Sequence, residues 1–187
     1  MTSKELADLD RRFLWHPFTQ QQGWLSEDAP IIHSAKGCML TDVDGRQYID
    51  GVSSLWCNVH GHRHPTIDKA IQDQLGRVAH STMLGLSHEP AIELAQRLNA
   101  ITPERLTRTF YSDSGSTATE IALKIAFQHH QQSGSPERTR FLSMRDAYHG
   151  DTIGAVSAGG IDLFQATYGP RHFDTLKATP GDIAEPE

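Results

Sequence analysis

The residues best suited to chemistry in this sequence are the small polar ones at 112–116, Ser-Asp-Ser-Gly-Ser. Strand formers at 108–111 precede them and apolar residues at helical spacing follow from Thr117, which predicts a strand, a turn and a helix. Thr117 and Glu120 have the spacing of a capping box. Such a turn directs free backbone N–H groups and hydroxyls to one spot, where the helix dipole favours an anion, most often a phosphate. Taken alone, the turn also fits a plain change of chain direction.

A second group of candidate residues is Tyr-His-Gly-Asp at 148–151. Tyr148 follows a predicted strand, and an aromatic ring at that place can stack on a planar cofactor ring. Asp151 can orient a group nearby. The alternative is that Tyr148 covers the sheet edge while Asp151 caps the next helix, which is a common arrangement.

Three alternating histidines, His60, His62 and His64, suggest a metal site because imidazole binds zinc, copper and nickel. They lie in a glycine-containing loop just before Pro65, and no helical His-Glu-x-x-His accompanies them. We therefore expect no metal here, and favour backbone positioning and hydrogen bonding for these side chains.

The segment 53–58, Ser-Ser-Leu-Trp-Cys-Asn, brings a tryptophan, a thiol and small polar groups together. Trp56 reads either as a core residue or as a wall of a substrate pocket. Cys57 and His60 form a conceivable nucleophile pair, but nothing in the sequence orients the histidine.

Periodicity and turn signals indicate the elements that position these residues. The strong Asp44–Gly45 turn signal predicts a hairpin. The strands are expected at 31–40, 47–49, 108–111 and 140–144, with the approach to another at 173–180. The helices are expected at 3–13, 65–75, 89–101 and from 117 to about 133, followed by a short one that Gly159–Gly160 ends.

From residue 108 the predicted order is strand, helix, strand, helix, which is typical of a parallel sheet with crossover helices. Ligands of such sheets bind at the carboxyl ends of the strands. The loops after Tyr111 and Met144 both lie there, so we expect them to face one crevice. The sequence therefore predicts an α/β fold in which the two candidate groups meet.

Composition narrows the class of protein. The 187 residues suffice for one domain of ordinary size, with 37% hydrophobic and 21% charged residues. A net charge of −6 argues against a general nucleic-acid binder. No apolar run approaches the roughly 20 residues of a membrane span, and the first residues lack a signal-peptide core. Cys38 and Cys57 give no disulfide framework, so a cytoplasmic location is expected. The polar residues 181–187 read as a solvated tail or as a cut through a longer protein.

Taken together, these segments resemble the class III pyridoxal-phosphate-dependent aminotransferases of fold type I. Within that family the chain is similar to the biotin-pathway branch, which converts 8-amino-7-oxononanoate to 7,8-diaminononanoate. The segments that carry the resemblance run in family order at 14–20, 50–62, 80–82, 111–116 and 148–154.

The resemblance implies a fold and an assembly. Residues 1–60 would form the N-terminal segment with its hairpin, and residues 61–187 the first, incomplete part of the large cofactor-binding domain. The full-length enzyme would be a homodimer that takes small-molecule substrates.

The resemblance also implies roles at the first two groups. Gly115 and Ser116, together with Ser114, would bind the phosphate of pyridoxal phosphate. Tyr148 would pack on the pyridine ring and line the substrate site, and Asp151 would support that wall.

A third set of residues would border the substrate. Trp56 and Leu55 belong to it by the resemblance, as does Phe18. Phe18 stands where some members carry a tyrosine, and Leu55 stands where those members carry a tryptophan. These two differences leave the amino donor open between S-adenosylmethionine and lysine.

The residues that perform the chemistry in this family are not found here. A pyridoxal-phosphate transaminase needs a Schiff-base lysine and an acid at the pyridinium nitrogen, and both belong to the second half of the family's sequences. The lysines of this chain, none of them in a matching motif, are Lys4, Lys36, Lys69, Lys124 and Lys177. We expect no catalytic residue in the chain and no activity of the chain alone. The rival hypothesis is a non-catalytic module that binds a phosphate ligand or a partner subunit.

Overall fold

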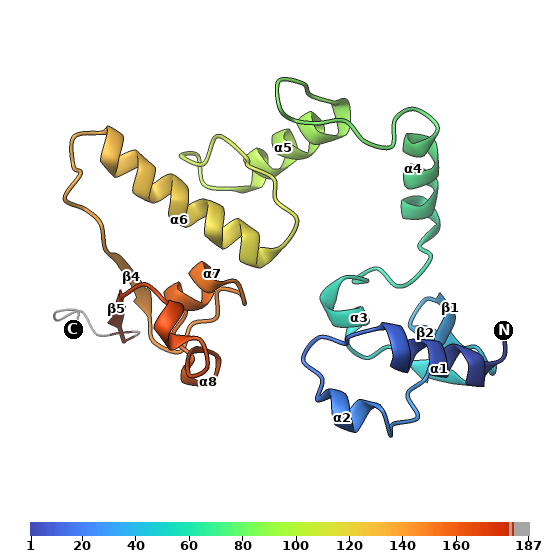
Figure 1. Ribbon diagram of the computed structural model, residues 1–187. Coiled ribbons are helices and arrows are strands. Elements are labelled where there is room, and N and C mark those ends of the chain that lie inside the picture. The colour runs from blue at the N-terminus through green and yellow to red at the C-terminus, as the bar shows by residue number, and fades with distance from the viewer. Residues whose placement is uncertain (180, 182–187) are drawn as a thin grey trace. The chain divides into compact units, whose positions relative to one another are not determined.

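The computed structural model describes residues 1–179 and residue 181 (Figure 1). The chain divides into two compact units, residues 1–88 and 89–187, and each is described by itself. Most of the polar segment 181–187, for which a tail and a cut through a longer protein were both considered, lies outside the described residues, as does Pro180.

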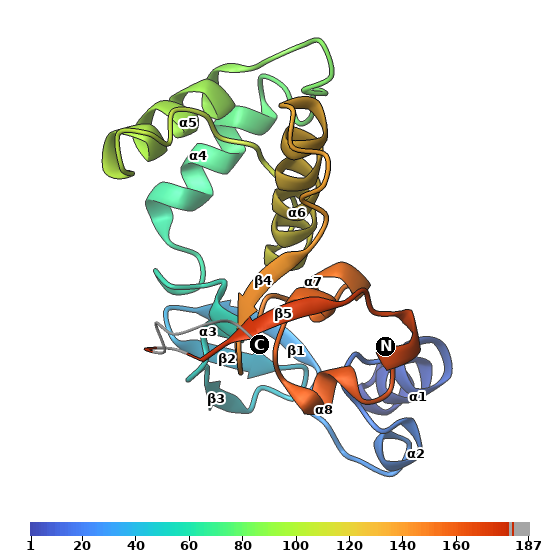
Figure 2. The ribbon, with the colours of Figure 1, turned by 90° about the vertical axis from the view of Figure 1, so that its left-hand side faces the viewer.

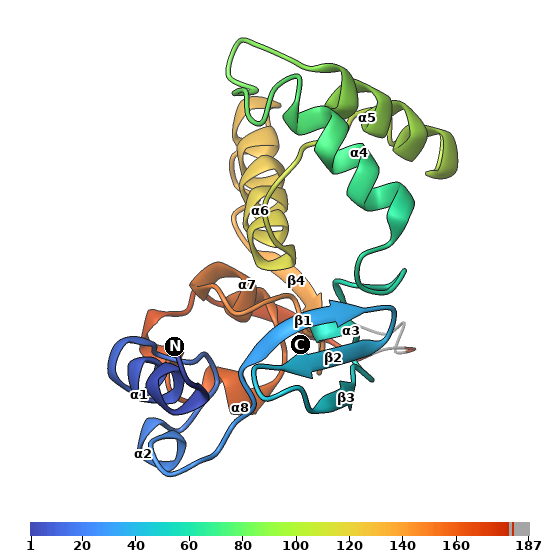
Figure 3. The same ribbon diagram turned by 90° about the vertical axis from the view of Figure 1, so that its right-hand side faces the viewer.

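The first unit begins with α1, Ser3–Phe13, as predicted. Its start is fixed by a capping box, in which Thr2 Oγ1 accepts from the N–H of Glu5 and the Glu5 carboxylate accepts from the N–H of Thr2. The short helix α2, Gln21–Trp24, follows. Figure 3 shows both helices beside the strands of this unit.

The strands of the first unit form an antiparallel sheet in the order β1-β2-β3, with β1 at Ile32–Lys36, β2 at Met39–Asp42 and β3 at Gln47–Ile49 (Figure 3). The prediction of one strand over 31–40 was wrong. Gly37, at φ +56°, turns the chain between two strands that pair with one another. The glycine tolerates this left-handed conformation without a steric penalty.

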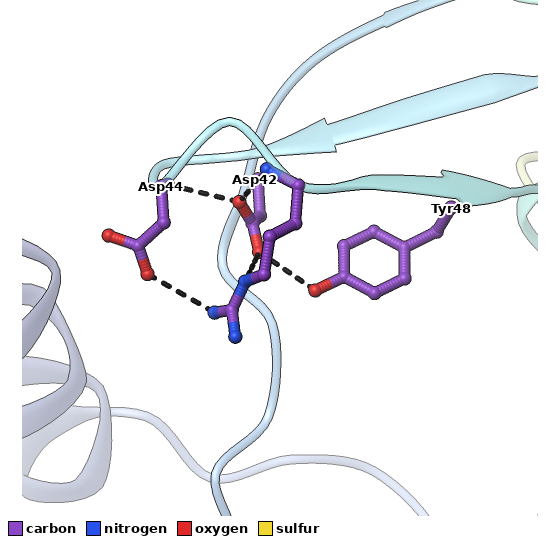
Figure 4. A network of polar contacts seen from close by, with 4 residues as sticks. Asp42, Asp44 and Tyr48 are labelled. Carbon is purple, nitrogen blue, oxygen red and sulfur yellow. Dashed lines mark hydrogen bonds and ion pairs between the residues drawn. The ribbon is translucent and has the colours of Figure 1, made fainter.

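The hairpin between β2 and β3 is held by the buried carboxylate of Asp42 (Figure 4). It accepts hydrogen bonds from the N–H groups of Asp44 and Arg46 at 3.0 and 2.8 Å, and from Arg46 Nε and the Tyr48 hydroxyl, both at 2.8 Å. Burial alone would raise the pKa of Asp42, but the bonds from Tyr48 and Arg46 outweigh it and lower the pKa. The tight turn predicted at Asp44–Gly45 is therefore confirmed.

After the sheet come α3, Ser53–Trp56, and α4, Pro65–Leu75. The bounds of α4 are those predicted, with proline in the first turn, where its missing N–H costs no hydrogen bond. The α3 segment is not a regular right-handed helix, because all four of its residues have positive φ.

The second unit contains five helices and two strands among its described residues (Figure 2). In chain order they are α5 at Glu89–Ile101, α6 at Gly115–Gln132, β4 at Phe141–Met144, α7 at Ile153–Ala158, α8 at Asp162–Gln165, the 3₁₀ helix η1 at Gly169–Arg171 and β5 at Thr175–Ala178. Strands β4 and β5 pair in parallel, with Phe141 opposite Thr175. The predicted parallel pairing is confirmed for the strand at 140–144 and the one approached at 173–180, with α7 and α8 between them, but not for the strand expected at 108–111.

The α7 helix lies at the centre of the second unit. All residues from Gly154 to Ala158 are buried, and α7 contacts α6, α8 and β4. Its small side chains explain this position, because glycine, alanine and serine let neighbouring backbones approach closely. Gly159 ends the helix, as predicted.

Two predictions around α6 were wrong. Residues 108–111 form no strand, because they enter no ladder with the strands of the described chain. The helix starts at Gly115 rather than at Thr117, with Ser114 as its N-cap. Tyr111 nevertheless anchors this segment, since its hydroxyl donates to the carbonyl of Ala91 in α5 at 2.6 Å.

Candidate functional site

The N-terminus of α6 is closed by a reciprocal pair of hydrogen bonds between Ser114 and Thr117. Ser114 Oγ accepts from the N–H of Thr117 at 3.2 Å, and Thr117 Oγ1 accepts from the N–H of Ser114 at 3.0 Å. The first bond within the helix runs from the N–H of Ala118 to the carbonyl of Ser114. The N–H groups of Gly115 and Ser116 precede that bond and remain available at the positive end of the helix dipole.

The capping box predicted between Thr117 and Glu120 does not form. Since the helix begins two residues earlier, Glu120 lies nearly two turns beyond the N-cap Ser114. Its Oε1 accepts from the Thr152 hydroxyl at 2.6 Å and from the N–H of Gly154 at 2.9 Å. Glu120 therefore joins α6 to the start of α7, a role that the sequence did not reveal.

The turn at the start of α6 and the segment 148–151 meet, as predicted, although residues 108–111 form no strand. The N–H of Asp151 donates to Ser116 Oγ at 3.0 Å, and the Thr119 hydroxyl donates to the carbonyl of His149 at 2.8 Å. Because Ser116 Oγ accepts this bond, its own proton can be donated to a further partner.

Gly150 makes this meeting sterically possible. It is buried at φ +122°, and a Cβ added to it would lie 2.7 Å from Ser116 Cα. Any side chain would separate the two loops. No role was predicted for this glycine from the sequence, although its place between the candidate residues Tyr148 and Asp151 was a signal for one.

Tyr148 and Asp151 form a pair at this site. The Tyr148 hydroxyl donates to Asp151 Oδ2 at 2.6 Å, while about half of the tyrosine surface stays exposed. The pKa of Tyr148 is raised, chiefly by its hydrogen bond to the carboxylate and also by partial burial. Asp151 does not cap the next helix, since Thr152 Oγ1 accepts from the N–H of Ala155 and is the N-cap of α7.

Phe18 lies in the first unit, in the loop between α1 and α2. It is 89% exposed and has φ +51°. The loop is tied down next to it, because His16 Nε2 lies 3.1 Å from both carboxylate oxygens of Asp10 and Trp24 Nε1 donates to Asp10 Oδ2 at 2.8 Å. The aromatic side chain is thus held at the surface by a polar anchor.

Leu55 and Trp56 also lie in the first unit, within α3. They are 68% and 76% exposed, so Trp56 is not a core residue of the described structure. The neighbouring carboxylate of Asp50 lies 2.7 Å from His62 Nε2. Its pKa is lowered to about 2, first by the hydrogen bond from the N–H of Ser54 and then by that from His62.

His60, His64 and Cys57, the remaining residues considered for a metal site or a nucleophile pair, make contacts of other kinds. The rings of His60 and His64 meet edge to face with centroids 6.0 Å apart. The thiol of Cys57 donates to the carbonyl of Leu55. Within residues 1–179 and 181, no group of three or more histidine, cysteine, aspartate or glutamate side chains is arranged so that it could hold a metal ion.

Comparison with known proteins identifies the family. The sequence pattern of class III aminotransferases matches residues 26–182 of the chain. The chain belongs to the class III aminotransferase family. No helix in the described part of this aminotransferase chain has both the length and the apolar character needed to cross a membrane.

Several relatives share one name, adenosylmethionine-8-amino-7-oxononanoate aminotransferase. The protein of Nitratidesulfovibrio vulgaris is 60% identical over 175 residues, which are 92% of this chain and 32% of the relative. That of Geobacter sulfurreducens is 47% identical over 176 residues, which are 94% of this chain and 39% of the relative. This class III chain therefore spans about a third of the length of the relatives that it matches.

Solved structures agree with the sequence matches. The enzyme of the same name from Methanocaldococcus jannaschii superposes with a TM-score of 0.91 at 41% identity, over 96% of this chain and 41% of that one. An (S)-enantioselective omega-transaminase from Thermomicrobium roseum gives a TM-score of 0.88 at 33% identity, over 96% and 40% of the two chains. The mixed α/β fold of this chain is thus the corresponding part of the aminotransferase fold.

Proposed function

We propose that this chain is part of an aminotransferase that converts 8-amino-7-oxononanoate to 7,8-diaminononanoate with pyridoxal phosphate. The observation that carries the proposal is the junction of Ser116 with Asp151, in a chain 60% identical to a relative of that name. The junction places the N-terminus of α6, which suits a phosphate, next to the segment that carries the aromatic ring of Tyr148. Pyridoxal phosphate has both a phosphate and a planar ring to be bound.

The residues at the junction fit the cofactor chemically. The N–H groups of Gly115 and Ser116 and the Ser116 hydroxyl are donors that suit a phosphate at a helix N-terminus. Space beside Gly115 is open, since nothing lies within 4 Å of a Cβ added there. Ser114, as the N-cap, fixes the direction of these donors.

The ring side of the site is provided by Tyr148. Its half-exposed aromatic face can stack on a pyridine ring, and its hydrogen bond to Asp151 fixes the orientation of that face. When bound, pyridoxal phosphate supplies the aldehyde and the electron-withdrawing ring by which an amino group passes from donor to acceptor. Within this chain, the proposed roles are binding and orientation.

Phe18, Leu55 and Trp56 are proposed to contact the substrates. All three are exposed apolar side chains on polar-anchored turns, and they suit the aliphatic chain of a keto acid. The relatives' name specifies adenosylmethionine, and we propose it as the amino donor. Lysine is the alternative donor, because Phe18 and Leu55 replace the tyrosine and tryptophan of other members.

The reacting amine is proposed to come from outside these 187 residues. The ammonium of Lys177, whose pKa burial lowers, donates to Ser143 Oγ at 2.9 Å and to the carbonyl of Gly159, so it is engaged with backbone and hydroxyl acceptors. We propose that the chain alone does not transaminate and that the full enzyme is a cytoplasmic homodimer. In it, residues 1–60 would be the N-terminal segment and 61–187 the first part of the large domain.

A chimera tests the proposed function. This chain replaces the matching segment of the Nitratidesulfovibrio vulgaris relative, and formation of 7,8-diaminononanoate is measured with each amino donor. We expect the chimera to form the diamine. Ser116→Asp should lower its affinity for pyridoxal phosphate, because the added charge repels the phosphate. The control Thr139→Asp should change that affinity little. A folded chimera that binds pyridoxal phosphate but makes no diamine would refute the proposed function and favour a binding module.

A further inference from the structure

The four residues of α3, Ser53–Trp56, share a backbone conformation that needs support. Their φ angles are +52°, +48°, +60° and +70°. Each non-glycine residue in the left-handed region costs roughly 1–2 kcal/mol. The exposed side chains of Leu55 and Trp56 bury too little apolar surface to offset that cost. The stabilising contacts of this turn must therefore be polar.

Asp50 supplies these contacts. Its Oδ1 accepts from the N–H of Ser54 at 2.8 Å, and its Oδ2 accepts from the Ser54 hydroxyl at 2.8 Å and from His62 Nε2 at 2.7 Å. Only 5% of the Asp50 side chain and 15% of the His62 side chain are exposed. A carboxylate so shielded depends on its donors, and two of the three, the N–H and the hydroxyl of Ser54, belong to the turn itself.

The sheet of the first unit fixes both partners. His62 exchanges two backbone hydrogen bonds with Gly37 at 2.8 and 3.0 Å, and the N–H of Asp50 donates to the carbonyl of Cys38 at 2.9 Å. Gly61, at φ +80°, allows this approach, since a Cβ there would lie 3.2 Å from Gly37 Cα. The turn between β1 and β2 is thus the base on which the Asp50–His62 pair is built.

We propose that Asp50 and His62 are positioning residues that hold Ser53–Trp56 in its left-handed conformation and so present Leu55 and Trp56 to the keto acid substrate. The assignment of the substrate to this turn rests on the proposed function. The role of Asp50 and His62 in holding the left-handed conformation rests only on the hydrogen bonds described above. His62 acts through Asp50, and Asp50 acts through the backbone and hydroxyl of Ser54.

Nuclear magnetic resonance of the 187-residue chain tests this conformational role. A residue with positive φ gives a strong intraresidue NOE between its amide and α protons, and we expect this signal at Leu55 and Trp56. Asp50→Ala and His62→Phe should weaken both signals. The same NOE at Phe18, which lies on a different turn, should persist in each variant and report that the unit is folded.

Two further variants distinguish the effect of the hydrogen bond from the effects of packing and of charge. His62→Gln retains an N–H donor near the position of Nε2 and should restore the NOEs that His62→Phe loses. Asp44→Asn removes a carboxylate from an exposed turn of the same unit and should change neither signal. Unchanged NOEs at Leu55 and Trp56 in both Asp50→Ala and His62→Phe, with Phe18 intact, would overturn the proposal.

The proposed contact of Leu55 and Trp56 with the keto acid is tested in the chimera between this chain and the Nitratidesulfovibrio vulgaris relative. Loss of one positioning hydrogen bond should raise KM for the keto acid about tenfold in His62→Phe, with kcat within about twofold of the parent. His62→Gln should return KM toward the parent value. An active parent chimera with the same KM in His62→Phe would overturn the substrate assignment of the turn. An inactive parent chimera would instead refute the proposed function and leave the NOE result standing.

Discussion

Ser116 Oγ accepts a hydrogen bond from the backbone N–H of Asp151 at 3.0 Å, across 35 positions of sequence. This bond joins the N-terminus of α6 to the segment that carries Tyr148. The N–H groups of Gly115 and Ser116 and the ring of Tyr148 are therefore held in the same part of the second unit.

Substitution of Gly150 should separate these two loops. In Gly150→Ala the new methyl group would overlap Ser116, and the backbone at φ +122° disfavours any side chain. We expect the free energy of unfolding of the second unit to fall by about 1–3 kcal/mol, measured by urea denaturation. Gly169→Ala is the matched control, because nothing lies within 4 Å of its added Cβ, and it should change stability by less than about 0.5 kcal/mol. Equal stabilities of the two variants would contradict this account of the junction.

Glu120 should matter as an acceptor and not as a charge. Glu120→Ala leaves the N–H of Gly154 without its partner in a buried segment, so we expect a loss of about 1–3 kcal/mol in unfolding free energy. Glu120→Gln keeps a carbonyl oxygen there and should lose much less. Hydrogen exchange of the α7 amides provides the measurement, with the exposed Glu137→Ala as control. Similar protection in Glu120→Ala and the parent would speak against this role.

Asp50 should make the first unit sensitive to acid. Its pKa in the folded chain is about 2, below the ordinary value of 3.8, so its stabilising effect is present above 3.8 and is lost as the pH falls toward 2. We expect Asp50→Asn to lower the stability of the first unit at neutral pH. In this variant the stability should also fall less steeply between pH 3.8 and 2 than in the parent. The control Asp28→Asn should keep the decline of the parent. Thermal unfolding of the first unit at a series of pH values checks this, and an equal decline in Asp50→Asn and the parent would disprove it.

Local signals in the sequence predicted much of the fold. The bounds of α1, α4 and α5 were predicted from apolar periodicity, and those of α4 and α5 also from an early proline. The hairpin at Asp44–Gly45 follows from its turn residues, because such turns are determined by a few neighbouring positions.

Contacts distant in sequence could not be predicted in the same way. The approach of Gly150 to Ser116 and the bonds of Glu120 to Thr152 and Gly154 depend on how α6 and α7 pack, which no local pattern encodes. Gly37 is a local turn signal within residues 31–40 that the prediction of one strand did not use, and two strands pair there instead.

We propose that this chain contributes the phosphate donors and the aromatic side chain of the cofactor site, while the reacting amine comes from outside these 187 residues. The most direct test treats the 187-residue chain with pyridoxal phosphate and borohydride and locates pyridoxyl groups by mass spectrometry. Lys177 is the informative position, because burial lowers its pKa while its ammonium is engaged with Ser143 and Gly159. We expect only substoichiometric labelling spread over the five lysines. A stable, stoichiometric adduct on one lysine would show that the reacting amine lies within this chain and would refute the proposal.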